Sequence, residues 1–131
     1  MNENLEIKEL ITLRIEQANE TIKEVGVLIE NHLYRVAISR IYYGMFYMLL
    51  ALSLKNNFKT SKHAQLIGWF NKTFIKKGIL NKKYGNIIHN AFEERSDSDY
   101  GVFVEFARDE VDKRYSEMKD FIITIENFLN K

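Results

Sequence analysis

The 131-residue sequence predicts an all-α helical bundle, and three observations support this fold class. Apolar residues recur three and four positions apart over several segments, which is the spacing of one face of a helix. Proline, which interrupts helices, does not occur in the chain. The alternation of apolar and polar residues that is typical of strands is not found. We therefore expect one helical domain over residues 1–131.

The first two helices are expected to form the centre of the bundle. The first has an apolar seam at Ile11, Ile15, Ala18, Ile22, Val25 and Ile29, and it is expected to end near residues 31–32. The second runs from about Leu33 to Lys55. Within it, Ala37, Gly44 and Ala51 are seven residues apart and form a stripe of small side chains where another helix can approach closely.

Three more helical segments follow. Thr60 or Ser61 is expected to cap the third helix, which ends in a basic turn at Gly78. Asn81 is expected to cap a short fourth helix that carries Arg95 on its apolar face, and the polar residues 96–101 predict a turn. The last helix is predicted from apolar residues at helical spacing, at Val104, Ala107, Val111, Met118, Ile122, Ile125 and Leu129.

Charge is distributed unevenly although the net charge is only +1. Residues 1–30 hold seven acids and three bases, residues 31–92 hold ten bases and no acid, and residues 93–131 hold eleven acids and six bases. Five lysines surround the connection between the third and fourth helices, at Lys72, Lys76, Lys77, Lys82 and Lys83. With Trp69 and Phe70 they form either a surface for a phosphate backbone and its bases, or a face that packs on the acidic helices.

Several classes of protein are excluded or disfavoured. The chain has no cysteine, which excludes disulfides and thiolate metal sites. His32, His63 and His89 are too far apart in sequence for a helical metal pair, so we expect solvated histidines, no metal and no cofactor. The acidic N-terminal residues do not resemble a signal peptide, and the 14 uncharged residues 41–54 fall short of the roughly 20 that a bilayer needs. We expect a cytoplasmic protein.

Arg95 is the first candidate functional residue. A guanidinium on an apolar helix face beside a polar turn can clamp a phosphate with two parallel hydrogen bonds. The alternative is an internal ion pair with Asp97, Asp99 or a neighbouring glutamate. Arg40, inside the apolar second helix, must likewise find a carboxylate or carbonyls in the bundle or at a subunit interface.

Several motifs then appear in an order that is similar to one known family. They are Arg40-Ile-Tyr-Tyr-Gly-Met-Phe-Tyr, Ser61-Lys62-His63, residues 74–80, and residues 91–95 followed by Asp99-Tyr100-Gly101. Over about residues 8–130 the chain resembles HEPN-domain proteins, in particular the small stand-alone members often encoded beside a minimal nucleotidyltransferase. The resemblance implies a four-helix up-and-down bundle with a short additional helix, commonly a homodimer.

The resemblance also implies a candidate active site. Many HEPN proteins are metal-independent ribonucleases of toxin–antitoxin, CRISPR-linked or other anti-phage systems. Their site is an arginine, a polar residue and a histidine four to six positions after the arginine, paired across the dimer. In this chain the first two are Arg95 and Ser96. Tyr100 stands five positions after Arg95, and residues 99–102 contain no histidine.

Three functions are therefore considered. The leading hypothesis is a dimeric HEPN protein of a toxin–antitoxin or defence module, with a nucleotidyltransferase partner, that binds RNA, a nucleotide or a partner protein. The second is a ribonuclease in which Arg95 stabilises the charged phosphorane. Asp99 or Tyr100, with Ser96 nearby, would act as the general base or acid. The third is a helical interaction module with no nucleic-acid role.

Overall fold

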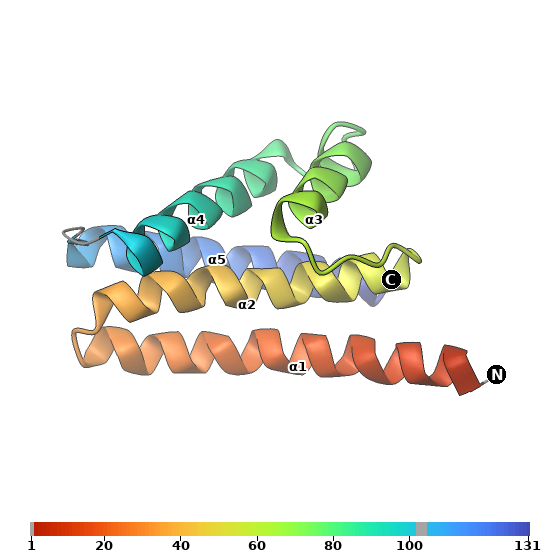
Figure 1. The fold of residues 1–131 in the computed structure, drawn as a ribbon, viewed down its shortest axis with the longest axis horizontal. Coiled ribbons are helices and arrows are strands. Elements are labelled where there is room, and N and C mark those ends of the chain that lie inside the picture. The colour runs from red at the N-terminus through yellow and green to blue at the C-terminus, as the bar shows by residue number, and fades with distance from the viewer. Residues whose placement is uncertain (1, 102–104) are drawn as a thin grey trace.

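The computed structural model describes residues 2–101 and 105–131, and over these ranges it confirms the all-α prediction. It contains five α-helices and one π-helical turn (Figure 1). These are α1 (Asn2–Glu30), α2 (Tyr34–Lys55), α3 (His63–Phe70), η1 (Asn71–Ile75), α4 (Lys82–Tyr100) and α5 (Arg108–Leu129).

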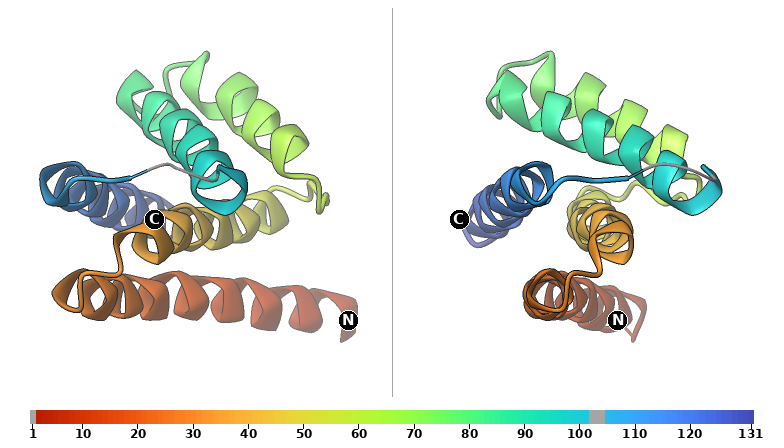
Figure 2. Two further views of the ribbon diagram at one scale, coloured as in Figure 1. Left: turned by 60° about the vertical axis from the view of Figure 1, so that its left-hand side comes forward. Right: turned by 90° about the vertical axis from the view of Figure 1, so that its left-hand side faces the viewer.

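The helix α2 is the centre of the bundle and packs against α1, α3, α4 and α5. Figure 2 shows α1 on one side of α2 and the pair α3 and α4 on the other, with α5 alongside. Among the described helices α2 alone is long and apolar enough to cross a membrane, with a hydropathy of 1.4, but 67% of that stretch is buried in the bundle. Its composition is therefore explained by its place in the core.

The stripe of small residues on α2 is confirmed as a site of close helix packing. Ala37, Gly44 and Ala51 are all buried. A Cβ atom added at Gly44 would meet Met118 of α5 and would lie 3.1 Å from Cγ2 of Thr21 on α1. Two helices therefore approach α2 at this one glycine.

The fourth helix is longer than the sequence predicts. The residues 96–101 that were expected to form a turn continue α4 as far as Tyr100, so α3, with 8 residues, is the short helix and α4 has 19. Long-range contacts explain the difference, because Arg35 of α2 donates a hydrogen bond from Nε to the carbonyl of Ser98 (2.7 Å). A cation bonded to a carbonyl of the last turn stabilises a helix.

The helix ends agree with the sequence in part. Asn81 caps α4, since its Oδ1 accepts a hydrogen bond from the backbone N–H of Lys83 (2.9 Å). Gly78, at the predicted end of the third helical segment, has a φ of 72°, a left-handed conformation that glycine adopts readily. The predicted Thr60 or Ser61 cap is wrong, because α3 begins at His63 and no side chain caps it. The expected helical residue Val104 lies outside the described residues.

Candidate functional site

Arg95 is held by an aromatic cradle made of Tyr42 and Tyr43 of α2 and Phe92 of α4. Its Cζ atom lies 5.1 Å from the ring centroid of Tyr42, 5.3 Å from that of Phe92 and 5.8 Å from that of Tyr43. All three distances are within the range of cation–π attraction. The side chain is only 12% exposed, so the helices fix the guanidinium in one place.

The polar partners of Arg95 leave part of its hydrogen-bonding capacity unused. Asp99, one turn further along α4, places Oδ2 3.6 Å from Nη1, which is an ion pair but too long for a strong hydrogen bond. The Nε atom is buried and finds no acceptor within the described residues. An oxygen of a bound anion would accept a hydrogen bond from this Nε donor, which otherwise has no acceptor.

His63 belongs to the same cluster, although the sequence predicts a solvated side chain at this position. Its Nδ1 atom lies 2.6 Å from the hydroxyl oxygen of Tyr42. Its ring stacks on that of Phe46, with centroids 4.1 Å apart and planes at 9°. Tyr42 therefore contacts both His63 and Arg95, and we call these three residues the Arg95–His63 cluster.

Burial and the positive charge of Arg95 set the protonation states in this cluster. Burial lowers the pKa of His63, and the charge of Arg95 lowers this pKa further. Burial also raises the pKa of Tyr42 well above its usual range, although Arg95 opposes the shift. At neutral pH the imidazole is therefore neutral and the phenol protonated. Because a hydroxyl both donates and accepts, Tyr42 can pair with either neutral tautomer of His63.

The other residues carried over from the ribonuclease motif are placed differently. Asp99 contacts Arg95, as the alternative of an internal ion pair anticipates. Ser96 is exposed, and Tyr100 is 77% exposed and lines a shallow hollow of about 490 Å³ beside Arg35. Because an α-helix has 3.6 residues per turn, Ser96 and Tyr100, one and five positions after Arg95, do not lie on the same face of α4 as Arg95. The structure thus brings Arg95 and Asp99 together, but not Ser96 or Tyr100.

Arg40 makes its contacts at the surface of the bundle. Its Nη2 atom lies 3.3 Å from Oε1 of Glu24 on α1, and its Cζ atom lies 5.8 Å from the ring centroid of Tyr43. The expected carboxylate partner is therefore present within the chain.

The five lysines around the connection between α3 and α4 are all exposed: Lys72 lies in η1, Lys76 and Lys77 in the turn after it, and Lys82 and Lys83 at the start of α4. Lys83 pairs with Asp120 of α5 (3.1 Å), and the other four make no ion pair within the described residues. Phe70 is fully buried and Trp69 is stacked on Phe58, so of the two alternatives a base-stacking surface here would not include Phe70. The five lysines therefore remain exposed basic side chains around the start of α4.

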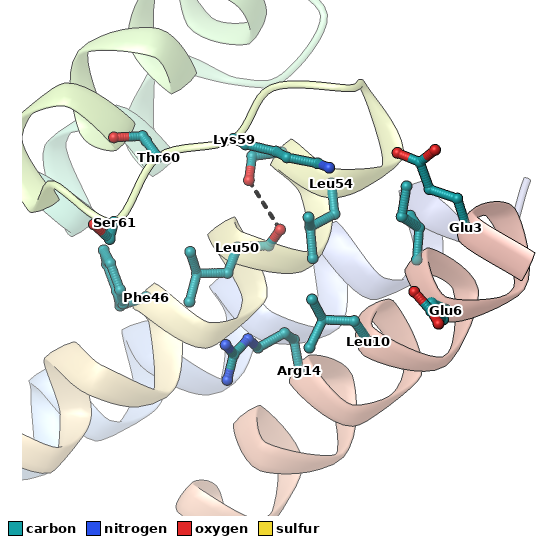
Figure 3. Close-up of a pocket in the computed structure, with 12 residues that line it drawn as sticks. Glu3, Glu6, Leu10, Arg14, Phe46, Leu50, Leu54, Lys59, Thr60 and Ser61 are labelled. Carbon is teal, nitrogen blue, oxygen red and sulfur yellow. Dashed lines mark hydrogen bonds between the residues drawn. The ribbon is translucent and has the colours of Figure 1, made fainter.

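The largest cavity described is lined in part by Phe46, the residue whose ring stacks on that of His63 (Figure 3). It has a volume of about 830 Å³ and is bounded by α1, α2 and the connection before α3. No group of three or more histidine and carboxylate side chains in residues 2–101 and 105–131 is arranged to hold a metal ion.

Comparison with known proteins identifies the family to which this scaffold belongs. Residues 11–130 match the HEPN domain, so the chain is a member of the HEPN family and the resemblance seen in its sequence is confirmed. It is 36% identical over 130 residues to a UPF0332 protein of Thermotoga maritima. The aligned region covers 99% of this chain and 91% of that protein. It is 38% identical over 97 residues to "Putative toxin MJ0605" of Methanocaldococcus jannaschii, covering 74% and 72%.

The sequence contains a weak signal for His63 as a site residue. Tyr42 and Phe46 are four positions apart and so share one face of α2, where an aromatic partner is expected. Which residue meets that face depends on how the chain returns after the connection at 56–62, and local spacing says nothing about that return.

Proposed function

We propose that this HEPN protein is the toxin-type member of a two-component module, and that its Arg95–His63 cluster binds a phosphate group of RNA or of a nucleotide. The proposal rests on the surroundings of one guanidinium. That of Arg95 is held in an aromatic cradle, its buried Nε donor has no acceptor among the described residues, and its single carboxylate contact is long. A planar guanidinium with unused donors suits a phosphate oxygen. The toxin names of relatives support the first part.

The lysine-rich start of α4 supports RNA as the source of that phosphate. Lys82 and Arg95 are 13 residues apart on one helix, which corresponds to about 20 Å along its axis. A few nucleotides of a single strand cover such a distance. Lys72, Lys76, Lys77 and Lys82 would then contact the backbone at one end of α4 while the Arg95–His63 cluster holds a phosphate near the other.

The proposal includes a homodimer and a nucleotidyltransferase partner. Exposed apolar side chains support a protein interface near the start of α2, where Leu33 is 50% and Val36 48% exposed, and Tyr100 of α4 lines a hollow with Val36. A second copy seated there would lie close to the end of α4 that carries Arg95. Val36→Glu is expected to weaken dimerisation in sedimentation experiments, whereas Ile123→Glu, on the exposed face of α5, is not.

A second candidate function, RNA cleavage, is favoured by the position of His63. In this reaction a ribose 2′-oxygen forms a bond to phosphorus, its proton passes to a base, and the P–O5′ bond breaks as the 5′-oxygen takes a proton. Arg95 would stabilise the charged phosphorane. His63 would supply the imidazole that residues 99–102 do not contain, in place of Asp99, which contacts Arg95, or Tyr100, which points elsewhere.

RNA binding and cleavage are tested with the same variants. Fluorescence anisotropy with a labelled structured RNA is expected to show salt-dependent binding that Arg95→Gln weakens about tenfold or more, since a charged hydrogen bond is lost. Arg108→Gln, on the exposed surface of α5, is the matched control and should bind as the wild type does. Equal binding by Arg95→Gln and the wild type would contradict the proposal. Binding without cleavage would leave binding as the function, and cleavage unchanged in His63→Gln would show that His63 is not the base.

A further inference from the structure

The cavity lined by Phe46 is an open groove with an apolar floor. Ile7 and Leu10 of α1 and Leu50 and Leu54 of α2 line it, and Figure 3 shows Leu10, Leu50 and Leu54 in the space between the two helices. All four are only partly buried, so the groove exposes apolar surface that a ligand would remove from water. A volume of about 830 Å³ is within the range of small-molecule sites.

Arg14 places an uncompensated positive charge in the groove. Its Nη1 atom donates to the side-chain oxygen of Gln17 (2.8 Å), but its Nε atom is buried and finds no acceptor among the residues described. No carboxylate within residues 2–101 and 105–131 forms an ion pair with it. In Figure 3 the guanidinium reaches from α1 toward Phe46 and Leu50. A buried donor with no acceptor is costly unless an anion supplies one.

The charges at the two ends of the groove differ in sign. Glu3 and Glu6 lie at the end near the start of α1, where the side chain of Lys59 points toward Glu3 from the opposite wall, whereas Arg14 lies at the inner end. Glu6 and Arg14 are eight residues apart, or about 12 Å along the helix. An anionic group is therefore repelled from the outer end and attracted to the inner end, with apolar side chains between them.

We propose that this groove binds an aliphatic carboxylate, with the carboxylate on Arg14 and an alkyl chain of about ten carbons over Leu10, Leu50 and Leu54. Charge complementarity decides the class of ligand. A neutral alcohol of the same length would bury the same apolar area but leave the guanidinium of Arg14 with a weaker acceptor. A quaternary ammonium of the same length would bring a second positive charge to Arg14.

Titration calorimetry of the full chain with decanoate, decanol and decyltrimethylammonium, each below its micelle concentration, tests the ligand class. Decanoate is expected to bind saturably with one molecule per chain, about tenfold or more tightly than decanol. The ammonium compound is expected to show no saturable binding. Equal affinity for decanoate and decanol, or tighter binding of the ammonium compound, would overturn the proposal.

Paired variants test the location. Arg14→Gln is expected to lower the decanoate affinity about tenfold and leave that of decanol nearly unchanged, while the control Arg108→Gln changes neither. Leu10→Glu is expected to abolish binding of both, whereas Leu13→Glu, on the exposed face of the same helix, has no effect. Circular dichroism confirms that each variant is folded.

One outcome would assign the groove to another occupant. If the wild type is a dimer that binds no decanoate, and Leu10→Glu but not Leu13→Glu dissociates it, a second copy of the chain fills the groove and the proposal is wrong. Unchanged decanoate affinity in Arg14→Gln would overturn it as well.

Discussion

The hydroxyl oxygen of Tyr42 lies 2.6 Å from Nδ1 of His63. The ring of the same tyrosine lies 5.1 Å from Cζ of Arg95. One side chain of the central helix thus connects a neutral imidazole from α3 with a guanidinium from α4. These two groups are 32 residues apart in sequence, and the bundle holds both next to the same aromatic ring.

The stability of the protein is expected to fall more steeply in acid because of His63. Burial and Arg95 lower the pKa of His63 from its usual 6.5, and Tyr42 and Tyr43 are the other titratable groups that face it. Below about pH 6.5 the unfolded chain binds a proton that the folded chain does not, so stability is lost as the pH falls. The melting temperature should therefore drop less between about pH 7.5 and about pH 5.5 in His63→Gln than in the wild type.

His89→Gln is the control for this measurement, because His89 is exposed and pairs with Glu93 one turn away. The slopes against pH are compared, and not the absolute melting temperatures, since His63→Gln also loses its contact with Phe46. Equal slopes in His63→Gln and the wild type would show that His63 is as easily protonated in the folded chain as in the unfolded one.

Arg114 is expected to stabilise the bundle through Glu94. The two form an ion pair between α5 and α4, with 23% and 18% of their side chains exposed. Arg114→Gln leaves Glu94 half-buried without its partner and should cost about 1–3 kcal/mol in the free energy of unfolding measured with urea. The control Arg108→Gln breaks an exposed pair with Asp112 and should change this free energy by about 0.5 kcal/mol or less.

The pH dependence of that cost has a definite sign. Burial raises the pKa of Glu94 even with Arg114 present, and removal of Arg114 raises it further. A carboxyl group with a raised pKa in the folded state destabilises the fold as the pH rises, because the unfolded chain ionises first. The cost of Arg114→Gln should therefore be smaller near about pH 5 than near about pH 8. A cost that grows in acid would contradict this account.

Two glycines on helices should respond to alanine in opposite directions. At Gly44 an added methyl group would meet Met118 and the Cγ2 atom of Thr21, so Gly44→Ala should destabilise the protein by about 1 kcal/mol or more. At Gly68 of α3 the same methyl group meets nothing within 4 Å, and Gly68→Ala should stabilise it by about 0.5–1 kcal/mol. Thermal melts of the two variants decide the matter; stabilisation by Gly44→Ala would show that α1 and α5 do not approach α2 closely.

Local patterns account for much of the fold that the sequence predicts. The seam of α1, which packs on the core, the small-residue stripe of α2 and the Asn81 cap all follow from short, regular spacings in the sequence, and all are confirmed. The predicted turn at residues 96–101 is wrong for the opposite reason. Its serines and aspartates favour a turn in isolation, but Arg35, more than 60 residues away, bonds to the carbonyl of Ser98 in the last turn of α4.

The candidate site is predictable only in part, for a similar reason. Arg95 stands out in the sequence because a charge occurs on an apolar helix face. His63 looks like a solvated residue at a helix start, since the groups that bury it, Tyr42 and Phe46, come from another helix. Its role depends on tertiary packing that no local spacing encodes.

The central claim, that the Arg95–His63 cluster binds phosphate, is tested most directly by nuclear magnetic resonance of the three histidine rings. Adenosine 5′-monophosphate is titrated into the full chain, and His32 and His89 serve as internal references. Phosphate binding at the cluster is expected to give a saturable shift of the His63 resonances, with His32 and His89 unchanged and no shift of His63 in Arg95→Gln. Equal shifts of all three histidines, or no shift of His63 at saturating nucleotide, would contradict it.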